Sequence, residues 1–181
     1  MPFISNTGKL DTHLCAFLDM IAWSEGTSKN VHPLTKMDGY DVIVTGVSGP
    51  EIFTNFSSHP FAGRRPPKHV TGSLFSSASG RYQFLEVHWN YYKEKLKLND
   101  FGPRSQDLWA LQLIRERRAL TDIKELRIQE AISRCSNIWA SFPGVGYGQP
   151  EHSMGQLIAV FESALNTLKS SAHHTKSDNF N

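Results

Sequence analysis

The hydrophobic positions between residues 11 and 25 repeat with the period of an α-helix. Leu14, Leu18 and Ile21 are separated by four and three residues, which places their side chains on one face. Asp11 precedes the run as a candidate N-cap, and Gly26 follows it as a helix terminator. The pattern therefore predicts a first helix over residues 11–25.

Glu25 continues the spacing of that apolar face, although it ends the run and has no basic neighbour in sequence. A carboxylate among apolar side chains is costly unless a partner or a chemical role compensates for it. The alternative is a glutamate of the last helical turn that extends into water.

The next segment, residues 40–56, changes to a strand-like pattern. Residues 40–46 and 51–56 are rich in β-branched and aromatic side chains and flank a turn at Gly49-Pro50, which predicts two antiparallel strands. Residues 57–80 are rich in serine, glycine and proline and predict a long loop, a length that is often functional. Helical patterns then return, with predicted helices at 82–97, 105–119, 126–140 and 152–169.

These elements predict an α+β protein with a small antiparallel sheet lobe and a larger helical lobe, with the active-site cleft between them. We expect a flexible lead over residues 1–9, a single domain over 10–169 and a disordered tail over 170–181.

Charge and composition restrict the function only weakly. The net charge of +2 permits an anionic partner, but the basic runs at 93–97 and 115–118 alternate with acids, which favours solvated helix faces over nucleic-acid binding. The sequence contains no apolar run of about 20 residues and no evident signal peptide. We therefore expect synthesis in a cytoplasm, without membrane insertion. Cys15 and Cys135 are expected to be reduced core residues.

Candidate chemistry lies in two glycine-containing segments. In residues 79–84, Tyr82 offers a stacking face and Gln83 an amide, although an ordinary helix entry capped by Ser79 has the same sequence. Residues 142–150 form a glycine-dense loop that carries Tyr147 and lacks the Gly-Lys-Ser/Thr ending of a phosphate loop. Such a loop could bind a sugar, or it could simply connect two helices. The eight histidines form no zinc motif, so neither a metal nor another cofactor is expected.

Taken in order, several segments resemble the endolysin of phage lambda and its relatives. The resemblance covers roughly residues 16–165 and rests on AFLDMIAWSEGT at 16–27, GYDVIV at 39–44, the Ser-x-His-Pro motif at 57–60, GRYQ at 80–83, SQD at 105–107 and RCSNIWASFPGVGYGQ at 134–149. It implies a lysozyme-like fold and a murein lytic transglycosylase that degrades peptidoglycan for host lysis. Glu25 stands at the catalytic glutamate of that family.

The resemblance also implies the rest of the site. Gln83 is expected to line the cleft and Tyr147 to lie near Glu25 or the sugar, with Tyr82, Ser136 and Asn137 as further substrate-binding residues. Loops 57–78 and 142–152 would be two lips over the glycan strand. A monomer is expected, held in the host cytoplasm until a holin gives access to the periplasm and cell wall.

Two other functions stay open. A hydrolytic muramidase needs a second carboxylate, for which Asp41 is the best candidate, although a strand-entry aspartate often serves only as a hydrogen-bond acceptor. A non-catalytic murein-binding protein would need neither acid. The 57–78 loop departs from the lambda pattern in length and composition. This departure leaves the fine substrate preference of the protein open.

Overall fold

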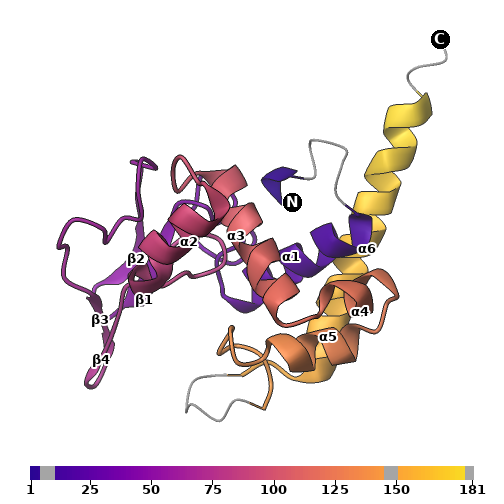
Figure 1. Cartoon of the computed structure of the whole chain (residues 1–181). Coiled ribbons are helices and arrows are strands. Elements are labelled where there is room, and N and C mark those ends of the chain that lie inside the picture. The colour runs from indigo at the N-terminus through magenta and orange to yellow at the C-terminus, as the bar shows by residue number, and fades with distance from the viewer. Residues whose placement is uncertain (5–10, 145–150, 178–181) are drawn as a thin grey trace. The chain divides into compact units, whose positions relative to one another are not determined.

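The chain forms two compact units in a computed structural model that describes residues 1–4, 11–144 and 151–177 (Figure 1). The helical unit comprises Met1–Ser24 and Leu113–Asn181, and the mixed unit comprises Glu25–Gln112. The elements are α1 Thr12–Ser24, β1 Val42–Gly46, β2 Gly49–Ile52, β3 Lys68–Thr71, β4 Leu74–Ser76, the 3-10 helix η2 Glu86–His88, α2 Trp89–Leu96, α3 Pro103–Glu116, α4 Leu120–Lys124, α5 Ile128–Cys135 and α6 Met154–Ser177. Within the described chain, no helix combines the length and the apolar character needed to cross a membrane.

Helix α1 is the centre of the helical unit and matches the predicted first helix closely. The Asp11 carboxylate accepts a 2.8 Å hydrogen bond from the His13 amide, which confirms Asp11 as the N-cap. Leu14, Leu18 and Ile21 are all buried. Helix α1 packs against α6 and α4, so its apolar face forms the core of this unit.

Helix α6 contributes the other side of that core. Leu157, Phe161 and Leu165 recur every four residues and are buried, as a helix packed on one face requires. The helix continues to Ser177, eight residues beyond the predicted end at 169. The predicted end at 169 rested on the polar composition of residues 170–177, which does not by itself end a helix.

The predicted helix over 126–140 is wrong in its bounds. One short helix, α5, lies in this region, and Leu126, the first residue of the predicted helix, has a left-handed backbone (φ 60°) that separates α5 from the preceding helix, α4. Asp122 lies inside α4 rather than in a linker and accepts hydrogen bonds from Arg127 and Arg134. These ion pairs join the two helices across the break.

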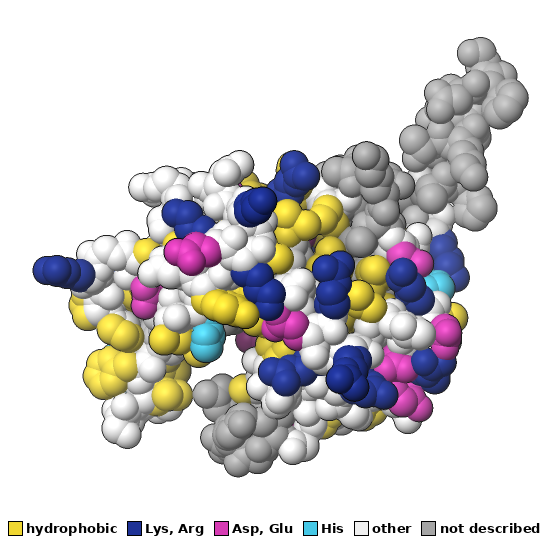
Figure 2. Space-filling view, in the orientation of Figure 1, with side chains coloured by type: hydrophobic (Ala, Val, Ile, Leu, Met, Phe, Trp, Pro, Cys, Tyr) yellow, Lys and Arg dark blue, Asp and Glu magenta, His cyan; other side chains and the backbone are white. Residues whose placement is uncertain are grey.

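The mixed unit contains the predicted pair of strands. Strands β1 and β2 are antiparallel with Val42 opposite Ile52, which confirms the small sheet. A second hairpin, β3–β4, lies in the region predicted as loop. Figure 2 shows hydrophobic side chains gathered over this hairpin, where Leu74 and Phe75 are exposed.

Aromatic side chains fill the core of the mixed unit. Phe84 and Trp109 stack in parallel with ring centroids 4.1 Å apart, and Phe101 meets Trp89 edge to face at 5.3 Å. Trp109 lies on α3, which begins at Pro103, two residues before the predicted start. The core thus anchors α3 beneath the segment that carries Gln83.

Both cysteines are buried thiols, as predicted. Cys15 lies in α1 and Cys135 ends α5. Burial raises the pKa of Cys135 to about 12, so the thiol stays protonated at neutral pH.

Candidate active site

Glu25 is the first residue after α1 and is half-buried. Gly26 follows with a left-handed backbone (φ 70°), the conformation that ends many helices. Thr27 then donates a 2.6 Å hydrogen bond from its hydroxyl to the Arg81 carbonyl. The backbone that leaves Glu25 is therefore held against the segment that contains Gln83.

That segment, residues 79–84, is a tight turn and not the start of a helix. The backbones of Ser79 and Phe84 exchange two hydrogen bonds of 3.0 and 2.9 Å, and both Gly80 (φ 78°) and Gln83 (φ 52°) are left-handed. The predicted helix from residue 82 is wrong for this reason, and Ser79 caps no helix here. Helical structure begins only with η2 and α2.

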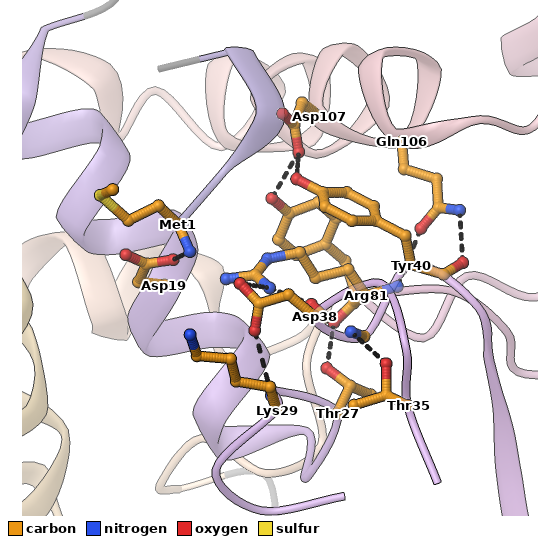
Figure 3. Close-up of polar contacts among 12 residues, drawn as sticks. Met1, Asp19, Thr27, Lys29, Thr35, Asp38, Tyr40, Arg81, Gln106 and Asp107 are labelled. Atoms are coloured by element: carbon orange, nitrogen blue, oxygen red, sulfur yellow. Dashed lines mark hydrogen bonds and ion pairs between the residues drawn. The ribbon is translucent and has the colours of Figure 1, made fainter. Parts of the chain in front are cut away.

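Two buried side chains from α3 hold the turn in place (Figure 3). Gln106 accepts a 2.8 Å hydrogen bond from the Arg81 amide and donates to the carbonyls of Tyr40 and Phe101. One Asp107 oxygen accepts the hydroxyls of Tyr40 at 2.6 Å and Tyr82 at 2.7 Å. The Ser-Gln-Asp segment of the sequence resemblance thus acts as internal support for the turn.

The two site residues predicted on this turn lie in different surroundings. Gln83 is half-buried, and its amide donates a 3.0 Å hydrogen bond to the Gly80 carbonyl. Tyr82 is 1% exposed, and burial together with Asp107 raises its pKa well above the ordinary value. This placement favours a supporting role for Tyr82 over direct sugar contact, because its ring face is covered.

Arg81 carries a second set of contacts from the same turn. Its guanidinium donates to the Asp38 carbonyl and lies 2.9 Å from the Asp38 carboxylate. Burial acts to raise the pKa of Asp38, but Arg81 and the Lys29 amide hold it below its ordinary value. Asp38 is therefore a charged structural partner of the turn.

Asp41 is buried and engaged at both carboxylate oxygens. Thr35 donates its hydroxyl to one oxygen, and the Lys36 amide donates to the other at 2.9 Å. The Asp41 carbonyl also accepts a 2.8 Å hydrogen bond from Phe53. These contacts give Asp41 the role of a hydrogen-bond acceptor that closes the loop before β1.

His59 of the Ser-x-His-Pro motif also supports the turn. Its Nε2–H donates to the Phe84 carbonyl at 3.0 Å, and its Nδ1 accepts the Phe61 amide, so these partners define the neutral tautomer. Burial lowers the pKa of His59 to about 4, while the Phe84 carbonyl opposes the shift. The imidazole is thus neutral over the physiological range.

In the helical unit, the chain on both sides of Tyr147 is tied to the end of α1. Ser141 lies 3.1 Å from Ser24, hydroxyl to hydroxyl, and the His152 amide donates to the Ser141 carbonyl at 2.9 Å. The His152 ring donates to the Ser24 carbonyl at 3.2 Å and packs on Trp23 with centroids 4.5 Å apart. Tyr147 itself lies outside the described residues. Ser141 and His152, the described residues that contact Ser24, precede and follow Tyr147 in sequence.

The remaining predicted residues also belong to the helical unit. Ser136 follows α5 and donates to the Ser133 carbonyl, and Asn137 is exposed. Among residues 1–4, 11–144 and 151–177, no group of three histidine, cysteine or acidic side chains is placed to hold a metal ion.

The sequence interpretation missed several supporting residues, above all His152, Gln106 and Asp107. His152 was considered only as a metal ligand, and a hydrogen bond spanning more than a hundred residues leaves no local signal. The pair Gln106-Asp107 was present in the resemblance, but its polar side chains gave no indication of complete burial.

Comparison with known proteins identifies the family of the chain. The Endolysin family model matches residues 15–168. The endolysin of Escherichia phage P2 is 58% identical over 160 residues, which cover 86% of this chain and 95% of the relative. The endolysin of Escherichia phage lambda is 51% identical over 154 residues, covering 85% and 92%.

Solved structures give the same relationship. Bacteriophage lambda lysozyme in complex with a chitohexasaccharide superposes with a TM-score of 0.78 at 49% identity, covering 86% of this chain and 96% of that one. Another structure of lysozyme from bacteriophage lambda gives a TM-score of 0.74 at 47% identity, with the same coverage. The chain therefore belongs to the endolysin family and has the α+β fold of lambda lysozyme.

Proposed function

We propose that this endolysin lyses bacteria by cleaving the MurNAc-β-1,4-GlcNAc bond of peptidoglycan without water. The products would carry 1,6-anhydro-MurNAc ends. The enzyme is then a lytic transglycosylase rather than a hydrolase. The relatives named endolysin, and the lambda lysozyme complex with a chitin oligosaccharide, support a β-1,4-linked amino-sugar strand as substrate.

In this mechanism Glu25 acts twice. Its carboxylic acid first donates a proton to the glycosidic oxygen, and the bond from that oxygen to the anomeric carbon breaks. The resulting carboxylate then takes the proton of the 6-hydroxyl group of the same MurNAc, whose oxygen bonds to the anomeric carbon. Glu25 regains its proton, and one acid is sufficient.

The engagement of the next two acids in the sequence is the observation that carries the proposal. Hydrolytic glycosidases generally use a second carboxylate as base or nucleophile. Asp38 is paired with Arg81, and both oxygens of Asp41 accept hydrogen bonds from the loop before β1. Either acid would have to break these contacts to activate water, whereas the transglycosylase route requires neither.

We also assign roles to the other site residues. We assign Gln83 to hydrogen bonding with the strand, from a turn that buried contacts hold rigidly. Tyr147 is assigned to sugar stacking near Glu25, with Ser136 and Asn137 as outer contacts of the glycan. Tyr82 is assigned to support of the turn through Asp107.

Access to the wall belongs to the same proposal. We assign the enzyme to the host cytoplasm until a holin opens the inner membrane, and afterwards to the periplasm, where it acts as a monomer on the glycan strands.

Mass spectrometry of purified murein digested with the protein and with the Glu25→Gln variant tests the mechanism. We expect anhydro-ended products from the natural protein and none from the variant, at equal folded amounts. New reducing ends in place of anhydro ends would establish a hydrolase. Binding of murein without any product would establish a non-catalytic protein.

A further inference from the structure

The formal charge of the chain is concentrated in one segment. Residues 42–79 contain three basic side chains, Arg64, Arg65 and Lys68, and one acid, Glu51. Their net charge of +2 equals that of the whole protein, so acids and bases balance over all other residues. A local excess of one sign attracts ligands of the opposite sign, even where the whole chain is nearly neutral.

Glu51 orients the Arg65 side chain but accepts a hydrogen bond from only one of its guanidinium nitrogens. One guanidinium nitrogen of Arg65 lies 2.5 Å from one Glu51 oxygen, and Lys68 reaches the other oxygen at 3.1 Å. The guanidinium also lies 4.7 Å above the ring of Phe61. Arginine has five N–H donors in a planar fork, and among the described residues Glu51 is the acceptor found for Arg65. The remaining donors belong to a side chain that is 40% exposed.

Arg64 adds a second cation beside it. The residue is exposed and has a left-handed backbone (φ 71°), and the two prolines that follow restrict the chain. Over the described part of the chain, no ion pair of Arg64 is found within 4 Å. Arg64 and Arg65 are therefore two adjacent exposed guanidinium groups, and the one nearby acid, Glu51, pairs with Arg65 and Lys68.

A polar cavity adjoins the pair. It has a volume of about 380 Å³, and its lining includes Thr54, Asn55, Ser57, Ser58 and Arg65. This volume falls in the range of small-ligand sites. Hydroxyl and amide groups with one guanidinium suit a peptide that bears a carboxylate, because arginine binds carboxylates through two parallel hydrogen bonds.

We propose that the basic loop, residues 61–68, binds carboxylates of the peptide stems that project from the murein glycan strand. The inference rests on the proposed function and adds the part of the substrate that a bare glycan lacks. The basic loop would strengthen binding of the protein to glycan strands that carry peptide stems. It would not strengthen binding to chitin-like strands, which have no stems.

Murein binding by an Arg64→Gln/Arg65→Gln double variant tests the proposal. The matched control is Arg117→Gln/Arg118→Gln, another adjacent exposed pair whose second residue is also left-handed (φ 59°). All proteins carry Glu25→Gln and are sedimented with murein in the cold for minutes at about 0.1 M salt, so strands stay intact. The ligands are native murein and the same murein with its stem carboxylates converted to amides.

We expect the double variant to bind native murein roughly threefold to tenfold more weakly, the range for two exposed charge pairs. Amidation of the murein should weaken binding of the parent protein by the same factor and leave binding of the double variant unchanged. The control variant should bind both ligands as the parent protein does. The proposal is overturned if the double variant loses as much affinity for amidated murein as for native murein. It is also overturned if the control variant loses as much affinity as the double variant, or if the double variant loses none. Arginine-dependent binding to phosphatidylglycerol vesicles with murein binding unaltered would overturn it as well. Binding is read separately from products, so an error in the cleavage mechanism leaves this result interpretable.

Discussion

At the residue scale, a few side chains fix the conformation of the turn that carries Gln83. Gly80 has a left-handed backbone, and a β-carbon added to it would collide with the Gln106 side chain. Gln106 in turn holds the Arg81 amide. The conformation of this turn therefore depends on a side chain from another element, helix α3.

We predict that Gly80→Ala lowers both stability and activity. The left-handed backbone costs an alanine about 1–2 kcal/mol, and displacement of Gln106 adds to this cost. Chemical denaturation and murein clearing measure the two effects. Gly72→Ala is the control, since Gly72 is also left-handed (φ 51°) but has open space around its β-carbon position. Equal losses of activity in the two variants would contradict a special role for the Gln106 contact.

The acid Asp41 separates the two chemical mechanisms. We predict that Asp41→Asn costs about 1–3 kcal/mol of stability, because an amide nitrogen replaces one of two buried acceptor oxygens. At a temperature where the variant is folded, we expect kcat to stay within a few-fold of the natural value. A fall of several hundredfold in a folded variant would instead make Asp41 the second carboxylate of a hydrolase.

At the element scale, the end of helix α1 is joined to two residues that follow α5. The Ser141 hydroxyl and the His152 ring both contact Ser24, the last residue of α1. These contacts couple the helix end to residues more than a hundred positions away in sequence.

We predict that His152→Ala lowers kcat/KM on murein roughly tenfold, because the end of α1, directly before Glu25, loses the hydrogen bond to the Ser24 carbonyl and the ring packed on Trp23. His13→Ala is a matched control: His13 also bonds a backbone carbonyl, that of Lys124, but at the opposite end of α1. We expect that variant to lose stability without a comparable loss of activity. Equal activity losses would show that any perturbation of α1 suffices.

The sequence predicted the elements whose signals are local, including α1 with its Asp11 cap and the β1–β2 pair. The β3–β4 hairpin was missed, although Gly72-Ser73 is a dipeptide typical of hairpin turns, because serine and proline dominate the surrounding composition. The turn at 79–84 was predicted as the entry to a helix beginning at residue 82, because its conformation depends on Gln106 and Asp107, which lie on another element. Glu25 and Gln83 are proposed as site residues from the resemblance, whereas the residues that support the turn can be identified only from three-dimensional contacts.

At the scale of the whole molecule, pH acts on stability through a buried histidine. His59 has a folded pKa of about 4, whereas an unfolded chain binds the proton near 6.5, so acid favours the unfolded state. The stability that the protein gains by keeping His59 neutral and buried is fully present above about pH 6.5. It is lost as the pH falls toward 4. Burial also lowers the pKa of His32, which acts in the same direction.

We predict a loss of about 2 kcal/mol in unfolding free energy between pH 7 and pH 5 from His59 alone. Urea denaturation at the two pH values measures it. In a His59→Gln variant the starting stability is lower, but the pH-dependent part of this loss should be absent. An unchanged pH slope in the variant would show that other groups cause the acid sensitivity.

The two thiols give the molecule a practical property. Cys15 and Cys135 are 2% and 0% exposed, and the high pKa of Cys135 keeps it in the unreactive form. A cysteine placed on an exposed position such as Ser163 of α6 would then be the accessible target for maleimide dyes or spin labels. Fluorescent tracking of the enzyme on a cell wall needs no prior removal of its natural sulfhydryl groups.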